Sequence, residues 1–430
     1  MQEKKSQRIY FGWWINLVTG VITGIAEVYT YQGASVLFKP IATDLGLDRA
    51  ATSVATGAGI LLNGFVFAFA GWLADRFGPR WVVLCGAVLM GSGAILMSTV
   101  SAAWSYYIIW ALLIVSGSTL AFSVAIDTML ANWFIRKRGL AFSIRFGLVG
   151  MIGVLLLPLL SWLIVTLGWR TTSIIWGGTL LASIPLLMHY VRPRKPEFYG
   201  LLPDGASPLL PAQTDPESIL NIGKRYASDT HETDYSLKQA LKTSAYWMIN
   251  LGWVANSVVH AGFNLHIVPW LTDKGITPVA AGSMLALMIF ITIPASVFGG
   301  LLANRVNKAH IKFLLVGALA LQSGGIVSFL LSPNLAGIYI LLIFYGLGLG
   351  TYTPVDILIR ARYFGRTAYG SIQGLAMLMS APLAFMAPVF TGWVFDNTGA
   401  YTIAFITLAA LAGAGALVIS CARPPAELSP

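Results

Sequence analysis

Charged residues are scarce in this chain of 430 residues, since only 10% are Asp, Glu, Lys or Arg, whereas 57% are hydrophobic. In soluble domains about a quarter of the residues are charged. The mean hydropathy of this chain is +0.74. The deficit extends over the whole length, which excludes a soluble protein held by a single membrane anchor. The fold itself is therefore expected to lie in a lipid bilayer.

Residues for catalysis and for metal binding are also missing. The two cysteines, Cys85 and Cys421, both lie in apolar stretches, so the sequence offers neither a disulfide framework nor the spacing of a metal site. It contains no Gly-x4-Gly-Lys-Ser/Thr sequence for nucleotide binding and no nucleophile with suitable partners. We therefore expect no metal, no cofactor and no enzyme activity.

Long apolar runs occupy most of the chain. A hydrocarbon core about 30 Å thick takes roughly 20 helical residues per crossing, and each crossing is expected to be helical because lipid offers the backbone no water to bond. The runs predict twelve spans: 10–34, 51–73, 81–99, 105–131, 140–165, 171–191, 244–268, 279–303, 311–331, 336–359, 370–392 and 400–421. The sequence thus predicts an all-α membrane protein with twelve transmembrane helices.

The basic residues between the spans predict the orientation. If both termini are cytoplasmic, 22 of the 27 Lys and Arg residues lie on the cytoplasmic side, four lie outside and one lies within a span. This agrees with the positive-inside rule. The net charge of +10 is therefore interpreted as an insertion signal and not as a sign of nucleic-acid binding. We expect a multi-pass protein of the inner (plasma) membrane.

A polar stretch with several prolines divides the spans into two sets of six. The predicted organisation is a first helical bundle at 1–190, a cytoplasmic linker at 191–243 with a short amphipathic helix near 235–242, and a second bundle at 244–430. The halves repeat each other weakly: Trp13-Trp-Ile-Asn-Leu17 returns as Trp247-Met-Ile-Asn-Leu251. Such repeats are typical of secondary transporters, whose substrate lies between the halves.

The loop Gly71-Trp-Leu-Ala-Asp-Arg-Phe-Gly-Pro-Arg80 closely resembles the signature of the major facilitator superfamily. More narrowly, the chain is similar to the bacterial monocarboxylate and oxalate/formate transporters in five motifs: Tyr10-Phe-Gly-Trp-Trp14, Phe38-Lys-Pro-Ile41, Trp133-Phe-x3-Arg138-Gly-Leu-Ala141, Pro196-Glu-x2-Gly200 and His266-x-Val-Pro269. The loop is expected to latch helices in the outward-open state, and so to act on conformation, through five residues: Gly71, Asp75, Arg76, Gly78 and Arg80.

The resemblance implies the major facilitator fold, in which two pseudo-symmetric six-helix bundles move organic anions by alternating access. The oxalate/formate relatives carry a substrate-binding lysine in span 11 and an arginine in span 8. The matching positions here lie near Ala376 and Ser296, so both cations are missing. Their loss favours a substrate with one negative charge over a dianion.

Four ionisable residues lie within spans, where each costs a few kcal/mol unless it has a partner or a function: Glu27, Asp127, Arg145 and Asp356. Asp127 and Arg145 lie at a similar depth in neighbouring spans, so we expect them to meet. They form either a structural ion pair or a site in which the planar guanidinium of Arg145 binds a substrate carboxylate and Asp127 holds Arg145 when the site is empty.

Proton coupling is predicted for Glu27, Asp127, His260 and Asp356. Glu27 and His260 lie at similar depth in spans that correspond in the two halves, where a carboxylate and an imidazole can exchange protons. The alternatives remain open: Glu27 held by a hydroxyl, His260 as an interior histidine, and Asp356 as a structural partner of Arg360 one turn onward.

Polar side chains at mid-membrane depth are the remaining candidates for substrate binding: Asn63, Asn256, Tyr29, Tyr31 and Tyr352. Hydrogen bonds between helices explain such residues equally well. His266, near the outer end of span 7, is expected at the membrane interface.

Together these features predict a secondary transporter of a small organic anion, most simply a monocarboxylate, that works by proton-coupled symport. Three alternatives remain: an organic anion exchanger, a proton-driven exporter of a cationic compound, and a ligand sensor without transport. The exporter would suit the summed charge of −2 on the four ionisable residues within the spans. The expected partners are a small anion, protons and the lipid bilayer, with no nucleic acid, and the protein is expected to function as a monomer.

Overall fold

The computed structural model describes residues 10–134, 138–192, 196–199, 204, 235–332, 334–364 and 369–425. Most of the predicted linker at 191–243 therefore lies outside the described residues. So does the side chain of Asp75 in the predicted loop motif, and Gly71 is described only as part of a helix.

Every regular element within these ranges is helical, which confirms the predicted all-α class. The first half contains α1 (Phe11–Glu27), η1 (Val28–Gln32), α2 (Ala34–Leu45), α3 (Arg49–Phe77), α4 (Pro79–Leu96), η2 (Met97–Thr99), α5 (Ala103–Ile108), η3 (Ile109–Val115), α6 (Ser116–Thr119), η4 (Leu120–Val124), α7 (Ala125–Trp133), α8 (Arg138–Ala182), α9 (Ile184–Tyr190) and η5 (Pro196–Tyr199). The second contains α11 (Leu237–Ala240), α12 (Ser244–Asp273), α13 (Pro278–Arg305), α14 (Lys312–Leu331), α15 (Leu335–Phe364), α16 (Tyr369–Thr398) and α17 (Thr402–Ser420).

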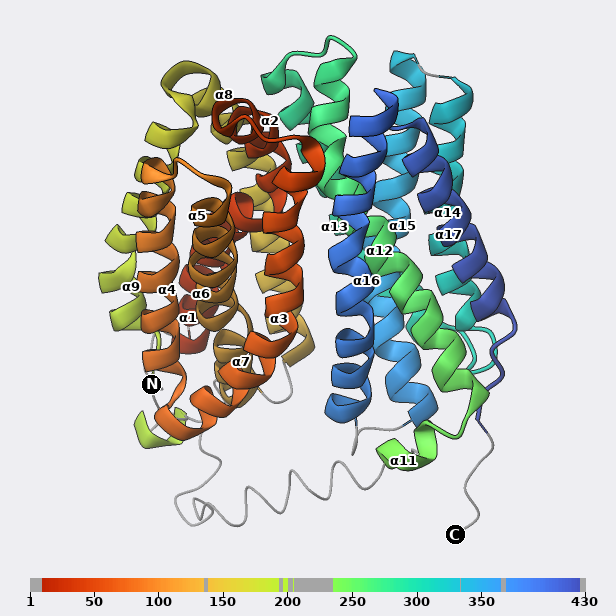
Figure 1. Cartoon of the computed structure of the whole chain (residues 1–430). Coiled ribbons are helices and arrows are strands. Elements are labelled where there is room, and N and C mark those ends of the chain that lie inside the picture. Colours follow the sequence, from red (N-terminus) through yellow and green to blue (C-terminus); the bar gives the residue numbers. More distant parts are fainter. Residues whose placement is uncertain are drawn as a thin grey trace, which may run out of the picture.

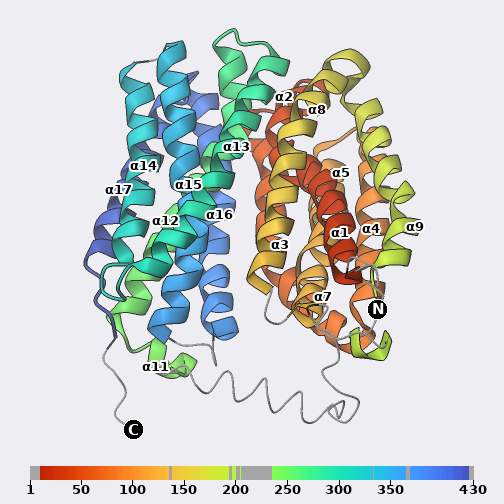
Figure 2. The same cartoon turned by 180° about the vertical axis from the view of Figure 1, so that it is seen from behind.

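The helices form two bundles that stand side by side, α1–α9 in one and α12–α17 in the other (Figure 1). The bundles meet where α3 packs against α16 and where α8 packs against α13, and the view from behind shows the same arrangement (Figure 2). α1 begins and α17 ends at one end of the molecule, which we call the terminal end. The opposite end is called the distal end.

The described helices account for twelve crossings. Ten stretches are long and apolar enough to cross a membrane, and one of them, Leu140–Tyr190, holds two crossings. It divides at Gly168, whose φ of 79° inside α8 is a left-handed conformation that glycine adopts without strain. The twelfth crossing is α12, which is less apolar because Asn, Ser and His residues recur along it.

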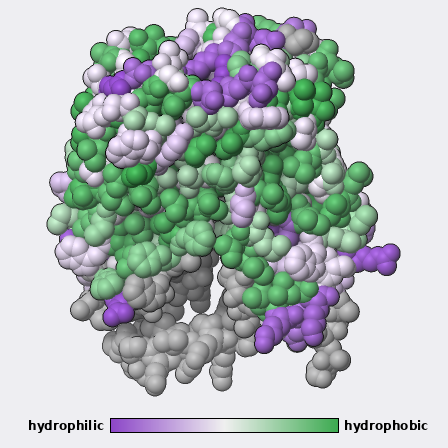
Figure 3. Space-filling model, in the orientation of Figure 1, coloured by the Kyte–Doolittle hydropathy of each residue, from purple (hydrophilic) through white to green (hydrophobic). Residues whose placement is uncertain are grey.

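Large apolar side chains cover the outside of both bundles. Leu331, Phe298 and Leu417 are among the most exposed, at 78%, 72% and 71%. In Figure 3 the hydrophobic residues cover the middle of the molecule, whereas hydrophilic residues gather toward the distal end at the top. A continuous apolar surface of this kind is what a protein surrounded by lipid requires.

Small residues and π-helical segments shape the first half. A Cβ atom at Gly86 of α4 would lie 2.5 Å from the backbone nitrogen of Ala121, so only glycine permits this close approach of helices. The described π-helical segments η1, η3 and η4 all belong to this half. Such segments are rare and occur frequently at functional sites.

Candidate functional site

A cavity of about 1270 Å³ lies between the two bundles. Its wall comes from α1, η1, α2, α3, η3, α6 and η4 in the first half and from α12, α13, α15 and α16 in the second. Most of the wall is apolar, and its amide, acidic and imidazole groups are Glu27, Asn63, Asn256, His260, Asn264 and Gln373. In the described part of the wall there is no Lys or Arg.

Five of the predicted residues line this cavity: Glu27, Tyr31, Asn63, Asn256 and His260. Tyr29 does not, because its ring is fully buried and its hydroxyl donates to Ser173 Oγ at 2.7 Å. Tyr352 is also fully buried, behind Trp253, whose ring centroid is 6.3 Å away. Both tyrosines therefore pack between helices in this conformation, outside the cavity wall.

Arg145 and Asp127 form the expected ion pair behind the wall. The Arg145 side chain is 3% exposed, and it also donates to the backbone carbonyl of Phe122, which lines the cavity. The Asp127 side chain is 35% exposed and lies one turn beyond Ser123 of the wall. In this conformation Arg145 is thus held by fixed neighbours and does not itself reach the cavity.

Glu27 stands in the wall beside this pair, where α1 passes into η1. Within the described residues its carboxylate makes no hydrogen bond or ion pair, and the charges of Arg145 and Asp127 both act on it. His260 lines the opposite half and makes no bond to Glu27. The two residues share the cavity, as their depth predicted, without contacting each other.

Asp356 and Arg360 form the second expected pair, fully buried in the second half. Arg360 Nε donates to Asp356 at 2.8 Å, and another guanidinium nitrogen donates to Asn250 Oδ1 at 2.6 Å. Neither residue belongs to the cavity wall. These contacts favour the structural interpretation of Asp356 over a role in proton coupling.

Several wall residues were not identified from the sequence. Asn264 and Trp253 lie on the same face of α12 as Asn256 and His260, and Trp110 of η3 belongs to the wall of the first half. The regular spacing of the polar residues along α12 could have indicated them, because positions four apart share a helix face. No spacing pattern in the sequence indicates Trp110, because its position in the wall depends on the π-helical segment η3.

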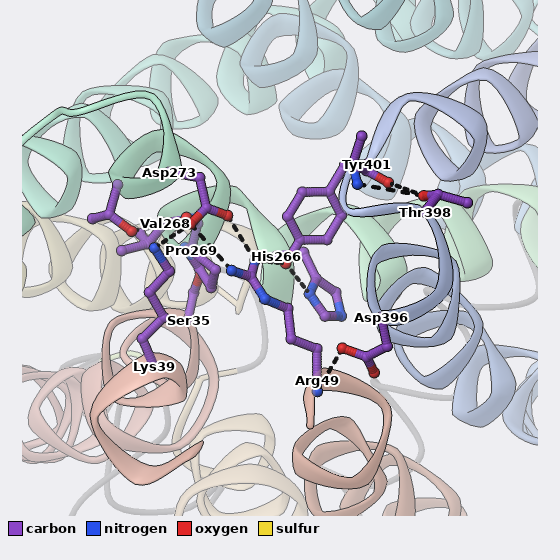
Figure 4. Close-up of polar contacts among 12 residues, drawn as sticks. Ser35, Lys39, Arg49, His266, Val268, Pro269, Asp273, Asp396, Thr398 and Tyr401 are labelled. Atoms are coloured by element: carbon purple, nitrogen blue, oxygen red, sulfur yellow. Dashed lines mark hydrogen bonds and ion pairs between the residues drawn. The ribbon is translucent and has the colours of Figure 1, made fainter. Parts of the chain in front are cut away.

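The two halves are joined at the distal end by a cluster that we call the distal gate: Ser35, Lys39, Arg49, Ser53, His266, Asp273, Asp396 and Tyr401. Lys39 Nζ lies 2.6 Å and an Arg49 nitrogen lies 2.8 Å from the Asp273 carboxylate (Figure 4). The Arg49 guanidinium also lies 3.5 Å from the centroid of the Phe395 ring. Every cation of the cluster belongs to the first half and every carboxylate to the second.

The gate also uses backbone and imidazole groups. Asp396 accepts hydrogen bonds from the backbone nitrogens of Arg49 and Ala50, at 3.0 and 2.8 Å, and so binds the first turn of α3 from the opposite bundle. His266, expected at the interface, is instead fully buried in the gate. Its Nδ1 lies 3.1 Å from the Tyr401 hydroxyl, and its Nε2 lies 3.1 Å from Ser53 Oγ.

Asp273 lies beyond the predicted span, at the end of α12. Partial burial acts to raise the pKa of Asp273, but hydrogen bonds from Arg49 and Lys39 outweigh it, so the net shift is downward from 3.8. The carboxylate therefore stays charged, and the gate stays paired, at neutral pH.

In the loop motif, Gly78 joins α3 to α4 with φ 83°, a conformation that favours glycine. Arg76 lies with its guanidinium carbon 5.7 Å from the Phe77 ring centroid. The Nε atom of Arg80 is buried and has no hydrogen-bond partner among the described residues. The latching role of the motif remains a prediction.

The sequence matches the profile of the Major Facilitator Superfamily over residues 17–388. It is 24% identical to monocarboxylate transporter 13 of Rattus norvegicus, over 95% of this chain and 89% of that protein. It is 23% identical to monocarboxylate transporter 2 of Homo sapiens, over 79% and 70%.

Two solved structures are similar in fold. One is a bacterial homologue of the human lysosomal transporter Spinster in an inward-facing, unoccupied conformation, with a TM-score of 0.67, 13% identity, and coverage of 97% of this chain and 96% of that one. The other is a mutant form of the peptide transporter POT, with a TM-score of 0.70, 15% identity, and coverage of 94% and 93%.

Proposed function

This chain belongs to the Major Facilitator Superfamily, and on that premise we propose that it carries a small organic monoanion across a membrane together with a proton. The similarity to proteins named as monocarboxylate transporters supports the substrate class. The absence of Lys and Arg from the described wall supports a single negative charge, because a dianion needs two cationic partners.

We propose that both termini are cytoplasmic and that the membrane is the inner (plasma) membrane, as the distribution of Lys and Arg predicts. The distal gate is then the outer gate. Since its ion pairs join the bundles, this conformation is closed to the outside and its cavity serves the cytoplasmic side. Transport requires the two bundles, which we take as 1–190 and 244–430, to rock about the cavity and open the gate.

The observation that carries the proposal is the group of charges beside the cavity. Glu27 lines the cavity and has no partner among the described residues, while Arg145 is held behind the wall by Asp127. The guanidinium fork suits a carboxylate, but a substrate reaches it only when Asp127 releases it. Protonation of Asp127, which is one-third exposed, removes the negative charge that holds Arg145.

In this mechanism one proton and one monoanion enter together, so the loaded carrier gains no net charge. Neutral loading matters because each elementary charge moved across 100 mV costs about 2.3 kcal/mol. Glu27, which lies within reach of the charges of both Asp127 and Arg145, is the alternative site for this one proton. His260 and Asp356 are not needed for this sequence of steps.

Transport by purified protein in liposomes tests the proposal. With labelled propionate, hexanoate or benzoate, wild type should accumulate an acid when the outside is more acidic. Arg145→Gln should lower transport at least about tenfold, since a charged hydrogen bond contributes about 1.5–3 kcal/mol. Asp127→Asn should retain exchange of acid for acid but lose accumulation driven by the proton gradient.

Arg170→Gln is the matched control, because Arg170 is paired with Asp44 at the distal end and lies outside the cavity wall. Its transport should resemble that of wild type. If Arg145→Gln and Arg145→Lys leave the rate and KM of every acid unchanged, Arg145 is structural and the anion mechanism fails.

One observation favours a second candidate, the export of an organic cation. The described wall presents the carboxylate of Glu27 and no basic side chain except the imidazole of His260. The same liposomes distinguish the two functions. Movement of a labelled quaternary amine against a counterflow of protons, without flux of any monocarboxylate, would replace the anion proposal.

A further inference from the structure

Three polar residues form a row along α12: Asn256, His260 and Asn264. Because they are four residues apart, they lie on one face of the helix, and all three belong to the cavity wall. At 1.5 Å per residue the row is about 12 Å long. It faces the half of the cavity that carries Glu27, Tyr31 and Asn63.

The hydrogen bonds of this row are incomplete. Asn256 Oδ1 accepts a hydrogen bond from Gln322 Nε2 at 3.0 Å, and Asn256 bonds to no other side chain among the described residues. Among the described residues, the Nδ1 atom of His260 is buried without a hydrogen-bond partner, and the side chain of Asn264 makes no hydrogen bond. Buried polar groups without partners cost about 1–3 kcal/mol each. This cost applies to His260 Nδ1, and helix packing supplies no partner for it or for the Asn264 amide, so both remain able to bond to a substrate in the cavity.

Aromatic rings also belong to the cavity wall. Trp253 is one turn before Asn256 on the same face, and Trp110 belongs to the wall of the first half. The described wall of the second half contains no Lys, Arg, Asp or Glu. This half can thus recognise neutral hydrogen-bonding groups and flat apolar surfaces, but not a second charge.

We propose that α12 selects the substrate by binding a neutral polar group, a hydroxyl or an amide, at the end of the molecule opposite to its carboxylate. The carboxylate faces the first half, the aromatic or apolar body lies between Trp110 and Trp253, and the remote polar group bonds to His260 and Asn264. The inference rests on the proposed transport of organic monoanions and names the class: aryl-containing monocarboxylates with a remote hydroxyl or amide.

Two acids that differ by one hydroxyl test this inference: 3-phenylpropionate and 3-(4-hydroxyphenyl)propionate. Binding to the purified protein and competition in liposomes should show that wild type prefers the hydroxylated acid at least about tenfold. A site built to bond a hydroxyl strongly rejects the analogue without it, because its own polar groups then stay unpaired.

His260→Leu and Asn264→Leu should each reduce this preference to threefold or less, because each lowers the affinity for the hydroxylated acid more than the affinity for 3-phenylpropionate. Thermal unfolding in detergent shows whether the variants fold. His260→Gln keeps a hydrogen-bonding group and should retain a preference for the hydroxylated acid. Val258→Ala is the matched control on α12, outside the wall, and should keep the wild-type ratio.

A wild-type ratio near one overturns the inference, and so does a ratio that neither leucine variant changes. In both cases flux of simple monocarboxylates would leave the proposed function standing. If neither test acid nor propionate, hexanoate or benzoate is bound or transported, the proposed function fails and this inference fails with it.

Discussion

Two ion pairs lie within the membrane helices that the structure describes, one in each bundle: Asp127 with Arg145, and Asp356 with Arg360. The pairs differ in access. Asp356 and Arg360 are closed off from the cavity, whereas a third of the Asp127 side chain is exposed. In the proposed mechanism only the first pair exchanges a proton, and the second is expected to serve stability.

Asp356→Asn should therefore destabilise the protein strongly. Removing one partner of a buried pair typically costs about 3–5 kcal/mol, because the other charge stays buried and uncompensated. Thermal unfolding in detergent measures the change. Asp127→Asn is the comparison and should be less destabilising, since its carboxylate is partly solvated; equal losses would contradict the assignment of the two pairs to different roles.

The pKa of Asp273 gives the distal gate a defined response to acid. Because the pKa in the folded protein is below 3.8, the stabilisation of the closed gate is complete above that ordinary value and is lost as the pH falls through the lowered pKa. Spin labels at Thr43→Cys and Lys274→Cys, with the exposed Cys85 and Cys421 replaced, would measure the gate. The distance should be constant from about pH 8 to 5 and should increase only below about pH 4.

Asp273→Asn is the control for this response. It lacks the titrating group, so the transition in the acid range should disappear. A distance that changes mainly between pH 8 and 5 would show that another group controls the gate.

At the scale of the helices, close approach of backbones holds the bundles together. A Cβ atom at Gly392 of α16 would lie 2.6 Å from the carbonyl oxygen of Arg49 at the start of α3. Gly392→Ala should therefore separate these helices and open the distal end, with a larger distance between the same spin labels. Gly317→Ala in α14 is the control, since nothing lies within 4 Å of its Cβ position, and its gate should remain closed.

The helices were largely predictable from the sequence, and their irregularities were not. The apolar runs predicted all twelve crossings because lipid requires long apolar helices. No pattern indicated that the first span would pass through η1 and continue after Gly33 as α2 to Leu45. A π-helical turn depends on packing against neighbouring helices, such as Gly153 of α8 beside Gln32, and sequence periodicity does not report such contacts.

At the scale of the whole molecule, the ion pairs that a single helix or two adjacent spans bring together were predictable, and the contacts between the bundles were not. Asp356 and Arg360 are one turn apart, and Asp127 and Arg145 lie in consecutive spans. From the sequence, Lys39 and Arg49 are ordinary charged residues outside the membrane. Their pairing with Asp273 depends on the position of the second bundle. Arg145 lies behind the wall because Asp127 and the backbone carbonyl of Phe122, both in its own bundle, hold it there.

The gate should behave as one cooperative unit across both bundles. Arg49→Gln and Asp273→Asn each break the same contact, so the double variant should open the gate little more than either single variant. A double-mutant cycle on the fraction of closed gate, from the spin-label distances, measures this coupling. Additive effects would show that Arg49 and Asp273 act independently, for example through Phe395 and Lys39 alone.

The carboxylate of Asp396 accepts hydrogen bonds from the first two backbone N–H groups of α3 across the interface. Hydrogen–deuterium exchange at these two N–H groups should therefore report the opening of the distal end. Their protons are shielded only while the bundles touch at that end. The rate of deuterium uptake at Arg49 and Ala50 would thus measure how often the distal end opens in the protein without spin labels or substitutions. A transported compound should change that rate.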